Sequence, residues 1–312
     1  MTGLIVVCGP TATGKSDQAL RLAQKLASPI IGADSRQIYR DFNIGTAKPS
    51  PQQLAAWPHY LIDWVDPRET VTLAEYQREA SRIIQATQAQ GRIPIVVGGT
   101  GLYIQSITAG LQIPAVPPQP DLRAQLQSLP QSLCYAYLQQ VDPQAANRIH
   151  PHDGVRTLRS LEVYYTTGQP LSRLQGWQPP DYPILWLGLT SAKPDLDKRI
   201  RQRVAAMMEQ GWIEEVMELQ ARYGRDLPLL QTLGYGEIGQ YLAGGIPQRD
   251  LEPLIGQHTR QLAKRQLTWF RRVPAIHWFD CQDPHLEEQM TARVEQFFDQ
   301  QGWSMSNDPN KG

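Results

Sequence analysis

The sequence predicts an α/β fold in which a parallel sheet is flanked by helices, with an all-helical insertion near the middle of the chain. Short apolar runs alternate with amphipathic helical patterns, and the runs are apolar at nearly every position. Such runs are typical of parallel strands that are buried on both faces. Two proline-rich stretches, residues 113–120 and 178–183, bound a segment of the chain that contains helical patterns and no strand candidate.

The first hundred residues contain the strand–helix–strand alternation. The predicted buried strands are residues 4–8, 29–33 and 93–97. A helix is predicted over residues 15–26, where apolar side chains recur on one face. A second helix is predicted over residues 72–90, because Thr72 and Glu75 have the spacing of a capping box. This alternation predicts crossover connections and hence parallel strands.

The rest of the chain is predicted to complete the same domain after the insertion. The predicted elements are a strand over 184–189, helices over 195–210, 212–223, 237–242 and 251–272, a strand over 275–279 and a helix over 285–299. We therefore expect a core of residues 1–114 and 181–305, a helical insertion of residues 115–180, and a flexible tail at 306–312.

Composition excludes several classes of protein. Thirty Lys and Arg residues balance thirty Asp and Glu residues, so a globally basic surface is excluded and only a local basic patch remains possible. Three widely separated cysteines, Cys8, Cys134 and Cys281, argue against a disulfide framework and a cysteine-based zinc finger. The apolar runs are too short for a signal peptide or a membrane span. We expect a cytoplasmic monomer.

A glycine-rich loop follows the first strand and opens the first helix. Its residues fit the pattern G-x-x-x-x-G-K-[ST] and are Gly9, Pro10, Thr11, Ala12, Thr13, Gly14, Lys15 and Ser16. In this context the backbone N–H groups and the helix N-terminus are suited to bind phosphate. Lys15 can neutralise phosphate oxygens, and the Ser16 hydroxyl can hold Mg²⁺. The pattern predicts a polyphosphate site on a P-loop NTPase-like fold; a plain strand-to-helix turn is the alternative.

Two polar side chains follow the ends of neighbouring predicted strands. Asp34 follows the strand at 29–33, and Thr100 follows the strand at 93–97 after two glycines. Ligands of open α/β sheets bind at the carboxyl ends of the strands, so both side chains should face the crevice beside the phosphate loop. Asp34 could act there as a general base or near a metal ion, or it could be an ordinary turn residue. Thr100 could equally be a helix N-cap.

Several motifs in order along the chain resemble the tRNA dimethylallyltransferase family. They are residues 9–16 (GPTATGKS), 34–39 (DSRQIY), 44–49 (IGTAKP), 58–63 (PHYLID), 98–103 (GGTGLY), 156–163 and 260–269 (RQLAKRQLTW). The resemblance extends from about residue 4 to residue 279. It implies that the loop binds the diphosphate of dimethylallyl diphosphate with Mg²⁺, not ATP, although the loop itself matches an ATP-binding motif. It also implies transfer of the prenyl group to the N6 amine of adenosine 37 of tRNA.

The resemblance also implies roles for individual residues. Asp34 would be the base that accepts the proton of the amine, and Thr100 would orient that amine through a hydrogen bond. Arg203 would contact the diphosphate, and Ser16 would be the metal ligand. The tRNA would be bound by Asp34, Ser35, Arg36, Gln37, Thr100, Arg123, Arg156, Arg159, Arg260 and Lys264.

The residues themselves give partial support for RNA binding. Between Pro253 and Phe279 no acidic residue occurs, and at 100° per residue Arg260, Lys264 and Arg271 fall within about 40° of arc on one helix face. A basic helix face that is merely solvated is the alternative. One segment, residues 231–236, lacks the basic side chains that relatives often carry on either side of Gly-Tyr. His150 and His152 are interpreted as a surface turn and not as a metal site.

Three other functions remain open at this stage. A small-molecule kinase would share the phosphate loop, but the strand at 93–97 has no acidic residue at its end. Prenyl transfer to free AMP or ADP would leave the helical insertion without a clear role. A non-catalytic RNA-binding module would not depend on Asp34.

Overall fold

The computed structural model describes residues 2–303, and the tail expected at 306–312 lies outside the described residues. A six-stranded sheet in the order β3-β2-β4-β1-β7-β8 forms the centre of the larger unit, and every neighbouring pair in it is parallel. The strands are β1 Leu4–Cys8, β2 Ile30–Gly32, β3 His59–Tyr60, β4 Ile95–Gly98, β7 Ile184–Thr190 and β8 Ile276–Asp280. The five strands expected from apolar runs and the parallel α/β class are confirmed.

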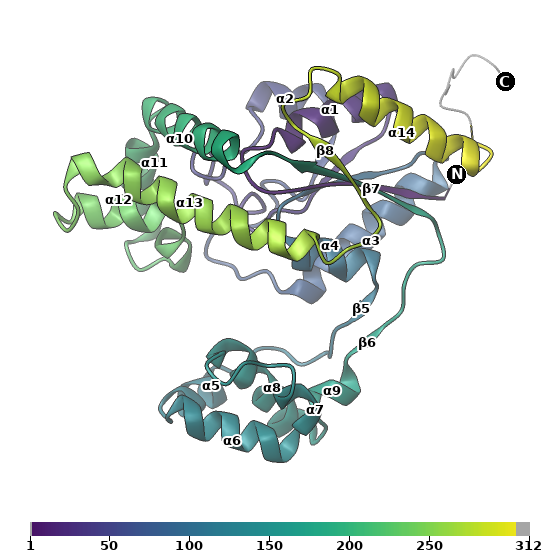
Figure 1. Ribbon diagram of the computed structural model, residues 1–312. Helices are drawn as coiled ribbons and strands as arrows, with labels where there is room; N and C mark the ends of the chain where they lie inside the picture. The colour runs from purple at the N-terminus through teal and green to yellow at the C-terminus, as the bar shows by residue number, and fades with distance from the viewer. Residues whose placement is uncertain (1, 304–312) are drawn as a thin grey trace. The chain divides into compact units, whose positions relative to one another are not determined.

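Helices cover both faces of this sheet (Figure 1). On one face, α1 (Lys15–Lys25) and α14 (Leu286–Gln300) pack over β1 and β7 through a cluster of buried apolar side chains. On the other face lie α3 (Leu73–Ala89) and α4 (Gly101–Thr108). Burial on both faces explains why the strand sequences are continuously apolar.

The start of α3 shows how local sequence determines an element. The Thr72 hydroxyl accepts a hydrogen bond from the Glu75 backbone N–H at 3.2 Å, and the Glu75 carboxylate accepts one from the Thr72 N–H at 2.7 Å. This is the capping box expected from the spacing of the two residues. Together the two side chains satisfy two backbone donors at the start of the helix, where N–H groups lack partners within the helix.

The helices after β7 agree with the expected elements within a few residues. They are α10 Lys193–Glu209, α11 Trp212–Tyr223, the short 3₁₀ helix η1 Pro228–Gln231, α12 Tyr235–Leu242 and α13 Gln248–Phe270. Helix α13 was expected to reach residue 272 but ends at Phe270, with Arg271 as its C-cap. The helix α2 (Pro51–Ala56), the strand β3 and the helix η1 were not anticipated, because each is too short to show a periodic pattern.

The chain divides into two compact units, and the smaller one comprises Gln105–Pro180. It contains α5 Pro120–Gln127, α6 Gln131–Val141, α7 Pro143–Ala146, α8 Gly154–Thr167, α9 Leu171–Leu174 and the antiparallel pair β5 Leu111–Gln112 and β6 Gly176–Trp177. Its first boundary precedes the expected residue 115, because the approach to the insertion already pairs with the segment that leaves it. The largest cluster in its core joins α6 to α8 around Cys134, Leu138 and Leu161.

A buried carboxylate organises the helices of the smaller unit. Glu162 on α8 is fully buried and accepts hydrogen bonds from the Gln119 backbone N–H at 2.7 Å, from Arg123 at 2.7 and 2.9 Å and from Arg159 at 2.5 Å. Burial alone would raise the pKa of Glu162, but these donors outweigh burial and hold the pKa below its ordinary value. The carboxylate therefore ties the start of α5 to α8.

Replacing Glu162 by Gln is expected to destabilise the smaller unit by roughly 1–3 kcal/mol at neutral pH, because charge-assisted hydrogen bonds are lost. A carboxylate with a lowered pKa stabilises the fold above its unfolded pKa, and this contribution is lost as the pH falls through the folded pKa. Thermal unfolding and hydrogen exchange of α8 at pH 7 and at pH 4 measure both effects. Glu79→Gln, which removes an exposed pair with Arg82 on α3, is the control and should change little.

Within the part of the chain that the structure describes, no helix is both long and apolar enough to cross a membrane.

Candidate active site

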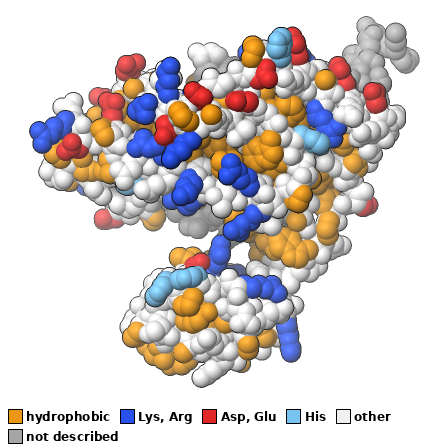
Figure 2. Space-filling view, viewed as in Figure 1, with side chains coloured by type: hydrophobic (Ala, Val, Ile, Leu, Met, Phe, Trp, Pro, Cys, Tyr) orange, Lys and Arg blue, Asp and Glu red, His pale blue; other side chains and the backbone are white. Residues whose placement is uncertain are grey.

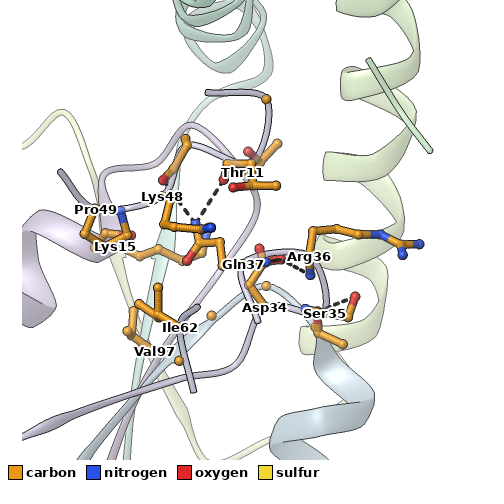
Figure 3. Close-up of a pocket in the computed structure, with 18 of the residues that line it drawn as sticks. Thr11, Lys15, Asp34, Ser35, Arg36, Gln37, Lys48, Pro49, Ile62 and Val97 are labelled. Atoms are coloured by element: carbon orange, nitrogen blue, oxygen red, sulfur yellow. Dashed lines mark hydrogen bonds between the residues drawn. The ribbon is translucent and has the colours of Figure 1, made fainter. Parts of the chain in front are cut away.

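The carboxyl ends of the parallel strands surround a cavity of about 690 Å³ in the larger unit. Its walls come from the phosphate loop, the segment after β2, the loop at residues 45–49, the turn after β4, and helices α10 and α13. Figure 3 shows Thr11 and Lys15 from the phosphate loop and Asp34 and Gln37 from the segment after β2 around this space. The residues expected to form the site from strand-end positions therefore lie around one cavity.

The phosphate loop has the backbone geometry that its glycines require. Gly9 has φ +141°, and a Cβ atom there would lie 2.4 Å from the Leu189 carbonyl oxygen on β7. Gly14 has φ +80° and is the N-cap of α1. The Thr13 hydroxyl donates to the Pro10 carbonyl at 2.8 Å, which closes the loop on itself. Larger residues at the two glycines would be strained or would clash with the sheet.

Lys15 extends back over this loop. Its Nζ donates to the Pro10 carbonyl at 3.2 Å. Burial, together with the cation of Arg203, lowers the pKa of Lys15 to about 8, while the charge of Asp34 acts in the opposite direction. In the same region burial raises the pKa of the Cys8 thiol to about 12, so Cys8 is a neutral packing residue of β1. A bound anion would stabilise the charged form of this buried lysine.

Asp34 and Thr100 meet at the ends of β2 and β4. The Thr100 Oγ1 accepts a hydrogen bond from the Ser35 backbone N–H at 3.0 Å, and the Thr100 N–H donates to the Ala33 carbonyl at 3.1 Å. Asp34 Oδ1 accepts hydrogen bonds from the backbone N–H groups of Arg36 at 2.8 Å and Gln37 at 3.4 Å. These bonds engage one of the two carboxylate oxygens, Oδ1, in a turn.

The segment after Asp34 is held by the loop at residues 42–48. The Gln37 side-chain amide donates to the carbonyls of Thr46 at 2.9 Å and Ala47 at 3.1 Å. In the same segment, the Arg36 side chain is exposed and points away from Asp34 (Figure 3). Arg36 is thus available to an external ligand, whereas the amide of Gln37 is engaged within the protein.

That loop is itself fixed by a carboxylate that the sequence analysis did not identify. Glu215 on α11 accepts hydrogen bonds from three successive backbone N–H groups, those of Asn43 at 3.0 Å, Ile44 at 2.7 Å and Gly45 at 3.2 Å. The Tyr235 hydroxyl donates to the same carboxylate at 2.8 Å. Tyr235 belongs to the 231–236 segment, so this segment stabilises the site through Tyr235 even without basic side chains.

Arg203 and a neighbouring arginine lie on the side of the cavity that the phosphate loop forms. Arg203 on α10 lines the cavity, and burial lowers the pKa of its guanidinium while the charges of Asp34 and Asp17 act in the opposite direction. Arg199, one turn earlier on α10, donates to the Ala12 carbonyl of the phosphate loop at 2.7 Å. Sequence reasoning assigned Arg203 from the resemblance and missed Arg199, because its partner lies 187 residues away.

The basic side chains of α13 and of its C-cap Arg271 are at least partly exposed. Arg260 is half-buried, whereas Lys264, Arg265 and Arg271 are exposed. Figure 2 shows Lys and Arg side chains gathered over the region of α13. Arg265 also lines the cavity, so the basic face adjoins the entrance to the site. An electropositive surface of this kind suits a phosphate backbone.

In the smaller unit, the three expected RNA contacts differ in their surroundings. Arg156 is 64% exposed and pairs with Asp153 at 3.5 Å. Arg123 and Arg159 are 40% and 30% exposed, and both are bound to the buried Glu162. Arg156 can therefore turn toward a ligand. Arg123 presents only the N–H groups that Glu162 does not use, and Arg159 in addition donates from Nη2 to the Val116 carbonyl at 3.0 Å. His150 and His152 lie on an exposed turn, as expected.

These features define a P-loop protein whose cavity can hold a diphosphate next to a carboxylate and a hydroxyl. The family model described as IPP transferase matches residues 37–273. A tRNA dimethylallyltransferase of Synechococcus sp. (strain JA-3-3Ab) is 63% identical over 292 residues, which cover 94% of this chain and 86% of the relative. One from Gloeothece citriformis (strain PCC 7424) is 55% identical, with 94% and 96% covered.

Solved structures support the same family. The tRNA isopentenylpyrophosphate transferase of Bacillus halodurans aligns with a TM-score of 0.71 and 32% identity, covering 97% of this chain and all of the other. A eukaryotic dimethylallyltransferase acting on tRNA aligns with a TM-score of 0.83 and 27% identity, covering 99% and 82%. The chain belongs to the IPP transferase family. The P-loop NTPase-like fold and the family expected from the motifs are confirmed.

Proposed function

We propose that the protein transfers a dimethylallyl group from dimethylallyl diphosphate to the N6 amine of adenosine 37, beside the anticodon of tRNA, and releases pyrophosphate. The observation that carries this proposal is that the phosphate loop, Asp34 and Thr100 line one cavity. A diphosphate leaving group and a base for the nucleophile are what such a transfer needs. The names of the relatives support dimethylallyl transfer to tRNA.

The reaction forms one bond and breaks another. The N6 lone pair attacks the allylic C1 carbon, the bond from C1 to the diphosphate oxygen breaks, and pyrophosphate leaves with the electron pair. The amine loses a proton, which Asp34 Oδ2 accepts, since Oδ1 is engaged by the Arg36 and Gln37 N–H groups. The Thr100 hydroxyl orients the amine by a hydrogen bond.

The negative charge that develops on the leaving group is stabilised by groups fixed before the reaction. Lys15, Arg203 and the N–H groups at the start of α1 face the diphosphate. Because these groups are held by the fold, little reorganisation accompanies the chemical step.

A divalent metal ion fits this donor set. Among the described residues no group of three or more His, Cys, Asp or Glu side chains could hold a metal alone. The exposed Ser16 hydroxyl and the phosphate oxygens of the substrate are the hard ligands that Mg²⁺ prefers, with water completing its shell. When bound, Mg²⁺ would supply additional neutralisation of the diphosphate charge.

The tRNA is bound by two sets of residues in this proposal. Arg260 and Lys264 contact the phosphate backbone, and the 34–37 segment contacts anticodon-loop bases. Arg123, Arg156 and Arg159 of the smaller unit contact the anticodon stem. The target adenosine leaves its stack to reach Asp34, as in other enzymes that act on a base. Free AMP as acceptor would leave the basic surface on α13 without a ligand.

Nucleoside mass spectrometry tests the proposed reaction. Unmodified tRNA with adenosine at position 37 is incubated with the protein, Mg²⁺ and dimethylallyl diphosphate, and a parallel sample receives ATP. A gain of one C5H8 unit on adenosine, only with the allylic donor, is expected. Phosphorylation in the ATP sample would support a kinase. Prenylation of AMP but not of tRNA would show that the acceptor is a free nucleotide.

Arg260→Ala is expected to weaken tRNA binding several-fold and to make the slope of log K against log salt less negative by about 0.7–0.9, since one phosphate contact is lost. Fluorescence anisotropy with an anticodon stem-loop over a range of salt concentrations measures the slope. Arg249→Ala, which removes an exposed arginine near the start of the same helix, is the control. An unchanged slope for Arg260→Ala would mean that Arg260 does not contact the phosphate backbone of the tRNA.

A further inference from the structure

One side-chain amide is hydrogen-bonded both to the phosphate loop and to the turn after β4, two parts of the candidate active site. Gln266 on α13 accepts a hydrogen bond at its Oε1 from the Thr11 backbone N–H, at 2.9 Å, and its Nε2 donates to the Gly99 carbonyl at 3.1 Å. Thr11 belongs to the phosphate loop, and Gly99 immediately precedes Thr100. The two partners of Gln266 lie 255 and 167 residues away in the chain.

The turn after β4 has the shape that this contact requires. A Cβ atom at Gly99 would lie 2.2 Å from Gln266 Nε2, and one at Gly101 would lie 2.2 Å from Trp269 Cδ1. Glycine at both positions therefore allows α13 to lie directly against the turn. The glycines of the GGTGLY motif and the Gln-Leu-Thr-Trp segment of α13 are two sides of one close contact.

The position of this contact relates it to the chemistry. On one side, the phosphate loop holds the leaving group through Lys15 and its N–H groups. On the other side, Thr100 is bound to the Ser35 N–H, and Ser35 follows Asp34. Transfer requires the amine and the allylic carbon to approach within about 3–3.5 Å in line with the leaving group. The distance between the phosphate loop and the Thr100 turn sets this approach.

We infer that Gln266 is a positioning residue that holds the phosphate loop at the separation from Thr100 and Asp34 that the transfer needs. This inference rests on the proposed prenyl transfer. Gln266 contacts neither reacting atom in this account, and it acts through the backbone of Thr11 and Gly99. Because the Thr11 N–H is already bound to Gln266, affinity for the diphosphate depends mainly on Lys15 and the later loop N–H groups.

Gln266→Met tests the inference, since it keeps the length of the side chain but removes both hydrogen bonds. We expect kcat to fall about 10- to 100-fold, the size of effect that a small misplacement of reactants produces. The KM for dimethylallyl diphosphate and the Kd for inorganic pyrophosphate should stay within about threefold of wild type, because the residues that bind diphosphate are untouched. Gln261→Met, which changes an exposed glutamine on the same helix, should leave all three constants unchanged.

Two further variants distinguish positioning from general stability. Gln266→Glu keeps an acceptor for the Thr11 N–H but turns a carboxylate oxygen toward the Gly99 carbonyl, so kcat should fall at least as far as in Gln266→Met. Gln266→Asn keeps the amide but shortens the side chain by one methylene. It should lower kcat while thermal unfolding stays close to wild type. Unchanged kcat in Gln266→Met, or a fall in kcat that follows only the loss of folded protein, overturns the inference.

The outcomes also separate this inference from the proposed function. If the wild-type protein does not prenylate tRNA, the proposed function fails, and the inference fails with it. If the wild type is active and Gln266→Met has the same kcat, only the role of Gln266 is refuted. A drop in kcat at constant pyrophosphate affinity supports both.

Discussion

Asp34→Asn is expected to lower kcat for prenyl transfer by about two to four orders of magnitude, the range that a positioned general base contributes. Asparagine keeps an oxygen that can accept the hydrogen bonds from the Arg36 and Gln37 N–H groups, so the turn remains intact. What is lost is the ability to accept the proton of the amine. Single-turnover kinetics with saturating tRNA and dimethylallyl diphosphate measure the chemical step, and tRNA affinity should change little.

Asp280→Asn provides a matched control. Asp280 accepts a hydrogen bond from the backbone N–H two residues later, at 3.0 Å from Gln282, as Asp34 does from Arg36. It lies at the end of β8 and does not line the cavity. We expect wild-type kcat for Asp280→Asn. If Asp34→Asn retained wild-type kcat as well, Asp34 would not be the base.

Lys15→Met is expected to lower kcat/KM for dimethylallyl diphosphate by about 10²- to 10³-fold, as removal of one fixed electrostatic donor does in other enzymes. The ligand-free variant should unfold no more easily than wild type, because burial disfavours the Lys15 charge that methionine removes. Steady-state kinetics and thermal unfolding measure the two effects. Lys25→Met removes an exposed lysine in the last turn of the same helix and should leave kcat/KM unchanged.

The pH dependence provides a second measurement on Lys15. With a pKa of about 8 in the free protein, Lys15 loses its proton above that pH, and kcat/KM for the diphosphate substrate should fall. Between about 8 and the ordinary value of 10.5, the unfolded chain binds more protons at this lysine than the folded chain. Through Lys15, the ligand-free protein therefore gains stability as the pH rises through this window.

Diphosphate binding should raise the lowered pKa of Lys15 again, because a bound anion favours the ammonium form. At pH 8.5 binding should be accompanied by proton uptake, which titration calorimetry detects as a dependence of the heat on the buffer. Lys15→Met should bind without this uptake. Proton release, or uptake that persists in Lys15→Met, would contradict the assigned pKa.

Much of the fold was predictable because its determinants are local in the chain. Strands β1, β4 and β7 are continuously apolar, and α3 begins at a capping box that two residues define. Short elements were not predictable. The two-residue strands β5 and β6 pair only because distant segments meet, and two residues show no periodicity.

The candidate site likewise contains some residues that were predictable from the sequence and others that were not. The phosphate loop and the strand-end positions of Asp34 and Thr100 follow from sequence motifs and the rule for parallel sheets. Glu215, Arg199 and Gln266 were missed, since each is an ordinary polar residue on a helix until its partner is known. No pattern in the sequence indicated that Arg123 and Arg159 share the buried Glu162.

The amino-acid sequence alone was sufficient to identify the family, the parallel α/β class, the phosphate loop and the residues expected to perform the chemistry. These properties depend on periodicity and on motifs within a few neighbouring residues. The tertiary structure was needed to find which groups hold those residues in place. The hydrogen bonds between Gln266 and Thr11 and between Gln266 and Gly99 join residues more than 160 positions apart, and only the folded chain brings these partners together.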